Sequence, residues 1–167
     1  MKAFWTLILV ATLPWCSPAL AEYCTVKSDG TETSCIFKTK RTPKDSQVVI
    51  SYTQQGWTMM VAVFRKDFAM IEGDSRVEIK KGPTHNIEYV STRRDLTFDR
   101  RVMEAPVYIV SEALLHDLGS AKGKTRFWLS ADKPKEVEVE IAASLFADIE
   151  AYIAETKTVL AALFEEE

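Results

Sequence analysis

The sequence predicts a mainly β fold, a single-domain antiparallel β-sandwich or partly open barrel with one short helix and a long C-terminal amphipathic helix. First, short runs rich in β-branched and aromatic residues recur between Gly, Pro and Asp turns, which is typical of all-β domains rather than βαβ units. Second, apolar and polar residues alternate strictly in Arg76–Lys80 and Glu136–Ile141. Third, helical periodicity appears only twice, both times late in the chain.

The segment Val48–Phe64 (VVISYTQQGWTMMVAVF) predicts a hairpin at the centre of the fold. Two apolar runs flank the polar group Thr53–Gly56, which supplies the turn. Both runs are apolar at nearly every position, so we expect a hairpin that is buried on both faces. The Gln-Gln-Gly break and the poor helix formers around it argue against a membrane-spanning helix.

The segment Met1–Ala21 has the pattern of a secretory signal peptide. An apolar core, Phe4–Leu13, is followed by a proline and by the small-x-small cleavage pattern Ala19-Leu20-Ala21. We therefore predict that residues 22–167 form a single exported β-rich domain, located in the periplasm or outside the cell. No second hydrophobic span follows, so no stable membrane insertion is expected.

The charge balance makes this a mildly acidic chain. Its 167 residues include 21 basic and 24 acidic side chains, a formal net charge of −3. Nucleic-acid binding proteins carry a basic excess, so no nucleic-acid partner is expected.

Cys24 and Cys35 are predicted to form a disulfide, because Cys16 leaves with the signal peptide and an even number of cysteines remains in an exported chain. Asp29-Gly30, a strong two-residue turn signal, lies midway between them. A hairpin folded about this turn places Cys24 opposite Cys35, within the range that a disulfide spans. The metal-binding alternative lacks further ligands, since the chain has two distant histidines.

Both helices are predicted from apolar spacing. A short one begins at Ser111, carries leucines on one side and ends at Gly119. A long one is capped by Ser144 and runs to about Phe164, with an apolar stripe that should pack on the sheet.

The sequence contains no recognisable catalytic motif, and no cofactor, metal or catalytic residue is predicted. Ser111, His116 and Asp117 have the residue types of a catalytic triad, but the sequence has no Gly-x-Ser-x-Gly elbow to support one. Glu136, Glu138 and Glu140 share one strand face, which is typical of a solvated surface. Phosphate-binding glycine loops and calcium loops are missing from the sequence.

Four arginines form the candidate anion- or partner-binding site: Arg93, Arg94, Arg100 and Arg101. They flank Leu96 and Phe98, which we expect to point into the core. The arginines then lie at both ends of a strand, close to Asp95 and Asp99. One interpretation is an edge strand whose charges protect it from pairing with other chains and aggregating. The other is a surface that recognises lipid A phosphates, peptidoglycan carboxylates or an acidic partner.

A second basic cluster has the same two interpretations. It consists of Lys38, Lys40, Arg41 and Lys44.

The layout resembles the invasion-associated locus B family of small exported bacterial proteins. An early Tyr23-Cys24 element is followed by a second cysteine, Cys35. Later in the chain a leucine-rich short helix, a Gly/Lys-rich turn, a strand pair and a final helix follow in this order. A second cysteine pair, usual ahead of the short helix, is missing from Met103–Val110. The resemblance implies a β-rich exported protein linked to host interaction, without an established enzymatic chemistry.

The functional expectation is an exported, non-enzymatic binding protein. Its partner would be an envelope or host protein or an anionic envelope component. The alternative is a periplasmic enzyme inhibitor, in which a loop such as Lys80–Asn86 plugs a cleft. A small hydrolase is the less favoured alternative.

Overall fold

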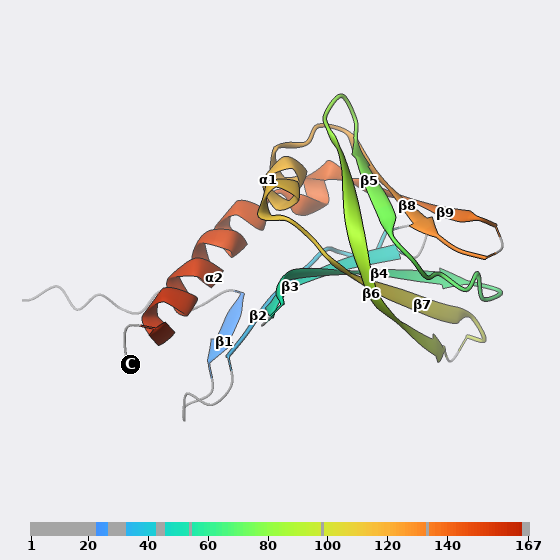
Figure 1. Ribbon diagram of the computed structural model, residues 1–167, viewed down its shortest axis with the longest axis horizontal. Helices are drawn as coiled ribbons and strands as arrows, with labels where there is room; N and C mark the ends of the chain where they lie inside the picture. The colour runs from blue at the N-terminus through green and yellow to red at the C-terminus, as the bar shows by residue number, and fades with distance from the viewer. Residues whose placement is uncertain are drawn as a thin grey trace, which may run out of the picture.

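Nine antiparallel strands form one bent sheet, in the order β1-β2-β3-β4-β7-β6-β5-β8-β9 (Figure 1). The computed structural model describes residues 23–26, 33–42, 46–53, 55–97, 99–132 and 134–164. Within these residues β1 and β9 stay at opposite edges, so the sheet is a partly open arrangement and not a closed barrel. The strands are β1 Cys24–Val26, β2 Thr33–Lys38, β3 Ser46–Thr53, β4 Gly56–Arg65, β5 Ser75–Ile79, β6 Thr84–Leu96, β7 Val102–Ile109, β8 Lys124–Ser130 and β9 Glu136–Ala142.

Several predicted features lie outside the described residues. They are the signal peptide, the Asp29-Gly30 turn, Lys44 and Phe98. The disulfide prediction is confirmed: Cys24 and Cys35 pair directly across β1 and β2 and are covalently bonded.

The β3–β4 hairpin forms as predicted, with Tyr52 opposite Trp57 and Gly56 at a positive φ of 94°. The expectation that both arms are buried on both faces is wrong for β3, whose side chains alternate between buried and half-buried up to Ser51. The physical reason is that the helices cover only one face of the sheet. The hairpin is interior, but the middle strand of the sheet is β7.

The short helix α1, Glu112–Ser120, begins where predicted, since the Ser111 hydroxyl accepts a hydrogen bond from the Leu114 amide. The predicted stop at Gly119 is wrong by one residue, because Gly119 lies inside the helix. A Cβ at Gly119 would lie 2.7 Å from Cγ2 of Ile149. This glycine therefore allows α1 and the C-terminal helix to approach closely.

The C-terminal helix α2 spans Ile149–Phe164, so the predicted start at Ser144 is wrong. Ala143–Phe146 instead form a 3-10 turn, η1. The turn buries Phe146 against Phe127, with ring centroids 6.5 Å apart, before α2 begins. The chain reverses direction after β9. The burial of Phe146 in the core outweighs the local preference for a helix that starts at Ser144.

The core lies between the inner face of the sheet and the two helices, and includes Leu114, Leu115 and Leu118 of α1. The Tyr152 ring of α2 packs within 6 Å of the rings of Tyr23, Phe37 and Trp57, and its hydroxyl lies 3.1 Å from the backbone oxygens of Cys35 and Ile50. Burial raises the pKa of the Tyr152 hydroxyl to about 12. We call the face that contacts α2 the inner face and the opposite one the outer face.

Candidate binding surface

The outer face of β3, β4 and β7 carries an apolar stripe. On β4, Met59 and Val61 are fully buried on the inner face, so Met60 between them points outward. Met60 pairs in register with Val49 of β3 and Val107 of β7, which share its face and are likewise half-buried. We define the outer apolar stripe as Val49, Met60, Ala62, Ala105, Val107 and Ile109, of which the two alanines are buried and the other four half-buried.

Basic side chains border this stripe on both sides. Lys38 of β2 pairs with Val49, and Arg93 of β6 pairs with Ala105. Both lie at the surface; the Arg93 side chain is 72% exposed and lies 3.6 Å from Asp95. The apolar stripe is thus flanked by a lysine on β2 and by an arginine on β6, where Glu88, opposite Ile109, and Asp95 also lie.

The two basic clusters of the sequence meet at one end of the stripe. The Arg41 guanidinium lies 3.9 Å from the centroid of the Phe64 ring, and the Arg101 guanidinium lies 5.9 Å from the same centroid. Arginine over an aromatic face is a favourable cation–π contact. Two segments about 60 residues apart in sequence therefore build one surface around Phe64.

The four predicted arginines have different environments. Arg93 and Arg100 are exposed, and Arg100 occupies the β6–β7 turn with a φ of 60°. Arg101 lies 2.5 Å from the Asp99 carboxylate, and its hydrogen bond, with a further one from Thr97, lowers the pKa of Asp99 to about 2.

Arg94 points to the inner face. Its guanidinium lies 2.6 Å from Glu72 and 3.3 Å from the buried Glu104, and the hydrogen bond to Glu72 is the main reason that its pKa is raised. Between Glu88 and Leu96 the strand partner of β6 is β7, and Arg94 and Arg101 are held in ion pairs, as the edge-strand interpretation expects. Arg93, which lies 3.6 Å from Asp95, and Arg100 are exposed, and a role of these two in recognition stays a prediction.

Two sequence expectations about this region need correction or extension. Leu96 is predicted to lie in the core but is 70% exposed, at the last position of β6 before the β6–β7 turn. The sequence analysis does not predict that Glu104 is buried or that the outward residues of β7 belong to the candidate surface. Apolar residues at both odd and even positions of β4 and β7 are the sequence feature that indicates an apolar outer face.

The other half of the sheet has a different outer face. Glu78 of β5, Arg126 of β8 and Glu140 of β9 form one register row. Arg126 lies 3.3 Å from Glu138 and 3.8 Å from Glu140, and Lys124 lies 2.5 Å from Glu140. This charged ladder is suited to water and confirms the predicted solvated face of β9.

The triad suggested by the sequence does not assemble. The Ser111 hydroxyl caps α1, and Asp117 pairs with His85 at 2.7 Å. His116 lies 2.8 Å from Glu150 and 3.2 Å from Glu112, which raises its pKa, chiefly through the hydrogen bond to Glu150.

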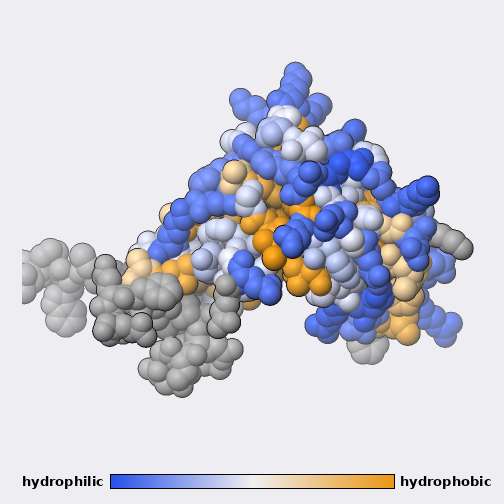
Figure 2. Space-filling view, viewed as in Figure 1, coloured by the Kyte–Doolittle hydropathy of each residue, from blue (hydrophilic) through white to orange (hydrophobic). Residues whose placement is uncertain are grey.

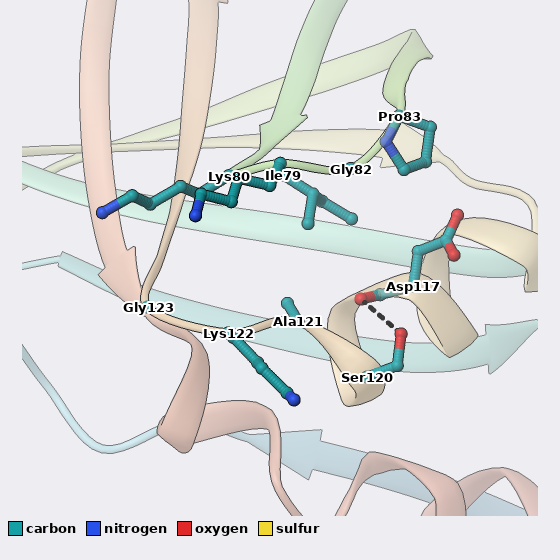
Figure 3. A pocket seen from close by; sticks show the side chains of 10 residues that line it. Ile79, Lys80, Gly82, Pro83, Asp117, Ser120, Ala121, Lys122 and Gly123 are labelled. Atoms are coloured by element: carbon teal, nitrogen blue, oxygen red, sulfur yellow. Dashed lines mark hydrogen bonds between the residues drawn. The ribbon is translucent and has the colours of Figure 1, made fainter.

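A cavity of about 510 Å³ lies between the β5–β6 turn and the loop that follows α1 (Figure 3). It includes the first part of the predicted Lys80–Asn86 loop. Figure 3 shows that the charged ends of Lys80, Lys122 and Asp117 point in different directions, so these three groups do not converge on one ligand atom. The Ser120 hydroxyl donates to the Asp117 backbone oxygen at 3.3 Å.

The described residues contain no group of three or more His, Cys, Asp or Glu side chains arranged to bind a metal ion. In the same part of the chain, neither helix has the length and apolar character needed to cross a membrane.

No protein-family model, curated protein or solved structure matches this chain.

Proposed function

We propose that this chain is an exported binding protein, without catalytic activity, that holds an acidic partner protein on the outer face of β3, β4 and β7. The observation that carries the proposal is the outer apolar stripe with Lys38 and Arg93 at its borders. An apolar sheet face gains free energy when it is covered, at roughly 25 cal/mol per Å² of apolar surface removed from water. The basic borders favour a partner that carries carboxylates around an apolar centre.

Charge complementarity selects the partner class. A second copy of this chain would bring basic borders towards one another, which opposes self-association. An acidic amphipathic segment would instead place its apolar side on the stripe and its carboxylates near Lys38 and Arg93. Its binding would weaken with salt, because exposed charges are screened over about 8 Å at physiological ionic strength.

Export is part of the same proposal. It is supported by the signal-like segment Met1–Ala21 and by the Cys24–Cys35 disulfide, since disulfides persist in oxidising compartments such as the periplasm and the cell exterior. Membership of the invasion-associated locus B family is consistent with this layout and remains part of the proposal.

One observation favours the inhibitor alternative. The β5–β6 turn projects from the body of the molecule (Figure 1), and Lys81 there has a φ of 61°. The turn is closed by a 2.8 Å hydrogen bond from the Gly82 amide to the Ile79 oxygen. A protruding, internally bonded loop has the shape that an inhibitor inserts into a cleft, since preorganisation reduces the entropy cost of binding.

The proposal is tested by capture of envelope proteins on immobilised, disulfide-bonded protein. The double variant Lys38→Glu/Arg93→Glu should lose the proteins that the wild type retains, and added salt should weaken retention by the wild type. The matched control is Glu138→Lys on the charged ladder, which should retain them. Equal capture by the double variant and the wild type would reject the outer face as the binding site.

A further inference from the structure

The connection between β4 and β5 exposes two large apolar side chains. Phe68 is 42% exposed and Met70 is 43% exposed. Met70 also has a φ of 55°, a left-handed conformation that costs free energy in a residue with a side chain. Backbone strain of this kind persists only where the surrounding structure enforces it.

The enforcing group is the buried carboxylate of Glu104. It is 0% exposed and accepts hydrogen bonds from the amides of Ala69, at 2.6 Å, and Ile71, at 3.0 Å. These are the residues on either side of Met70. The Ala69 oxygen also accepts a hydrogen bond from the Asp132 amide at 3.2 Å. The backbone around Met70 is therefore fixed on both sides while its side chain extends into solvent.

A third apolar side chain lies at the same end of the sheet. Leu96 is two residues beyond Arg94 on β6, and Arg94 contacts both Glu104 and Glu72. The β4–β5 connection and the β6–β7 turn lie at one end of the molecule (Figure 1). Apolar atoms reach the surface at this end, between hydrophilic side chains (Figure 2). We define the apolar tip as Phe68, Met70 and Leu96.

The charges around the tip favour an anionic surface. Three anions of this end are taken up by ion pairs: Glu72 with Arg94, Asp95 with Arg93, and Asp99 with Arg101. The remaining charged side chains on the adjoining described turns include more cations than anions. They are Arg65, Lys66, Arg100 and Lys135 against Asp67, Asp74 and Asp132.

We propose that the apolar tip docks this protein on an anionic lipid membrane. Phe68, Met70 and Leu96 enter the headgroup region, and the surrounding lysine and arginine side chains contact lipid phosphates. Such side chains suit this interface because their stems are apolar and their ends are charged. The inference goes beyond the proposed function, since its ligand is a lipid surface and its residues lie outside the outer apolar stripe.

The test is sedimentation with vesicles made of equal parts phosphatidylglycerol and phosphatidylcholine, against vesicles of phosphatidylcholine alone. The wild type should bind the anionic vesicles at least tenfold more strongly. Phe68→Ser/Met70→Ser/Leu96→Ser should reduce this binding tenfold or more. All three side chains are exposed, so the variant should fold. The matched control, Tyr52→Ser/Val90→Ser, changes side chains that are each 40% exposed elsewhere and should bind as the wild type does.

A second measurement reports insertion directly. The fluorescence of a tryptophan introduced by Met70→Trp should shift to shorter wavelength when anionic vesicles are added. The proposal is overturned by wild-type protein that stays in the supernatant, by a serine variant that binds as well as the wild type, or by an unshifted tryptophan emission. Reversal at Lys38 alone tests the proposed function separately, because it leaves the apolar tip and the ion pairs around it intact.

Discussion

The two halves of the sheet differ on their outer faces although they belong to one continuous structure. On β5, β8 and β9 most outward positions carry charged side chains, which pair with opposite charges across the strands, and Trp128 is the large apolar exception. On β3, β4 and β7 the outward positions include the Val, Met, Ala and Ile side chains of the outer apolar stripe, with the polar Gln47, Ser51 and Thr58 beside them. Both halves bury a similar apolar inner face, so folding alone does not account for the difference. An apolar outward face that persists beside a charged one indicates a surface that is covered in use.

The largest expected effect separates the two faces of β4. Val61→Asp should prevent folding, because it places an unpaired carboxylate at a fully buried inner position. Met60→Asp, at the neighbouring outer position, should leave a folded protein that is less stable by about 1 kcal/mol. Circular dichroism and thermal melting of both variants check this. A folded Val61→Asp protein would show that the inner and outer faces have been assigned wrongly.

Removing the buried carboxylate should have the next largest effect. Glu104→Leu leaves the partly buried Arg94 without its inner partner and frees the two amides beside Met70. Breaking a buried ion pair in this way typically costs about 3–5 kcal/mol. Chemical denaturation measures the loss. A change below about 1 kcal/mol would mean that Glu104 does not hold the β4–β5 connection.

Removing the disulfide should lower the stability less than removing the Glu104 carboxylate does. Cys35→Ala should lower the free energy of unfolding by about 2–4 kcal/mol while the fold survives, because the bridge closes a short loop at the edge of the sheet. Denaturation of the variant beside wild-type protein provides the comparison. Complete unfolding of the variant in buffer would show that the β1–β2 edge is essential to the core.

The α1–α2 contact should respond weakly to pH. The pKa of His116 is raised, mainly by Glu150 and then by Glu112, which itself contacts Lys157. A raised folded-state pKa contributes stability that is fully present below the ordinary value of 6.5 and is lost as pH rises through the folded value. His116→Gln should therefore lower the melting temperature more at pH 5.5 than at pH 8. An equal difference at both values would contradict this linkage.

The smallest effect is expected on the charged ladder. Glu138→Lys should change stability by no more than about 0.5 kcal/mol, because Glu138 is exposed and pairs only across the surface. Thermal melting beside the wild type is sufficient. A large loss of stability would contradict the distinction between a charged outer face that is exposed to water and an apolar outer face that binds a partner.

The mainly β fold, the disulfide and the β3–β4 turn followed from local signals: alternation, cysteine spacing and glycine in a polar break. The start of α2 and the exposure of Leu96 did not, because both depend on tertiary contacts that local patterns do not encode. Phe146 packs against Phe127, and Leu96 lies at the exposed end of β6. The candidate surface was predicted only in part. Arg41, Arg93 and Arg101 were recognisable as basic residues. That Arg93 borders the apolar stripe and that Arg41 and Arg101 meet at Phe64 depends on the strand order and on tertiary contacts.

Photo-crosslinking in cells tests most directly whether the outer apolar stripe is covered by a partner. A photoreactive residue is placed at Met60 or Val107 of the outer apolar stripe, and at Glu138 of the charged ladder as the control. The account predicts an adduct with the same acidic protein from both stripe positions and none from the ladder position, with loss of the adduct when Lys38 and Arg93 are reversed to Glu. Stripe positions that remain free of adducts, or that react no more than the ladder position, would contradict it.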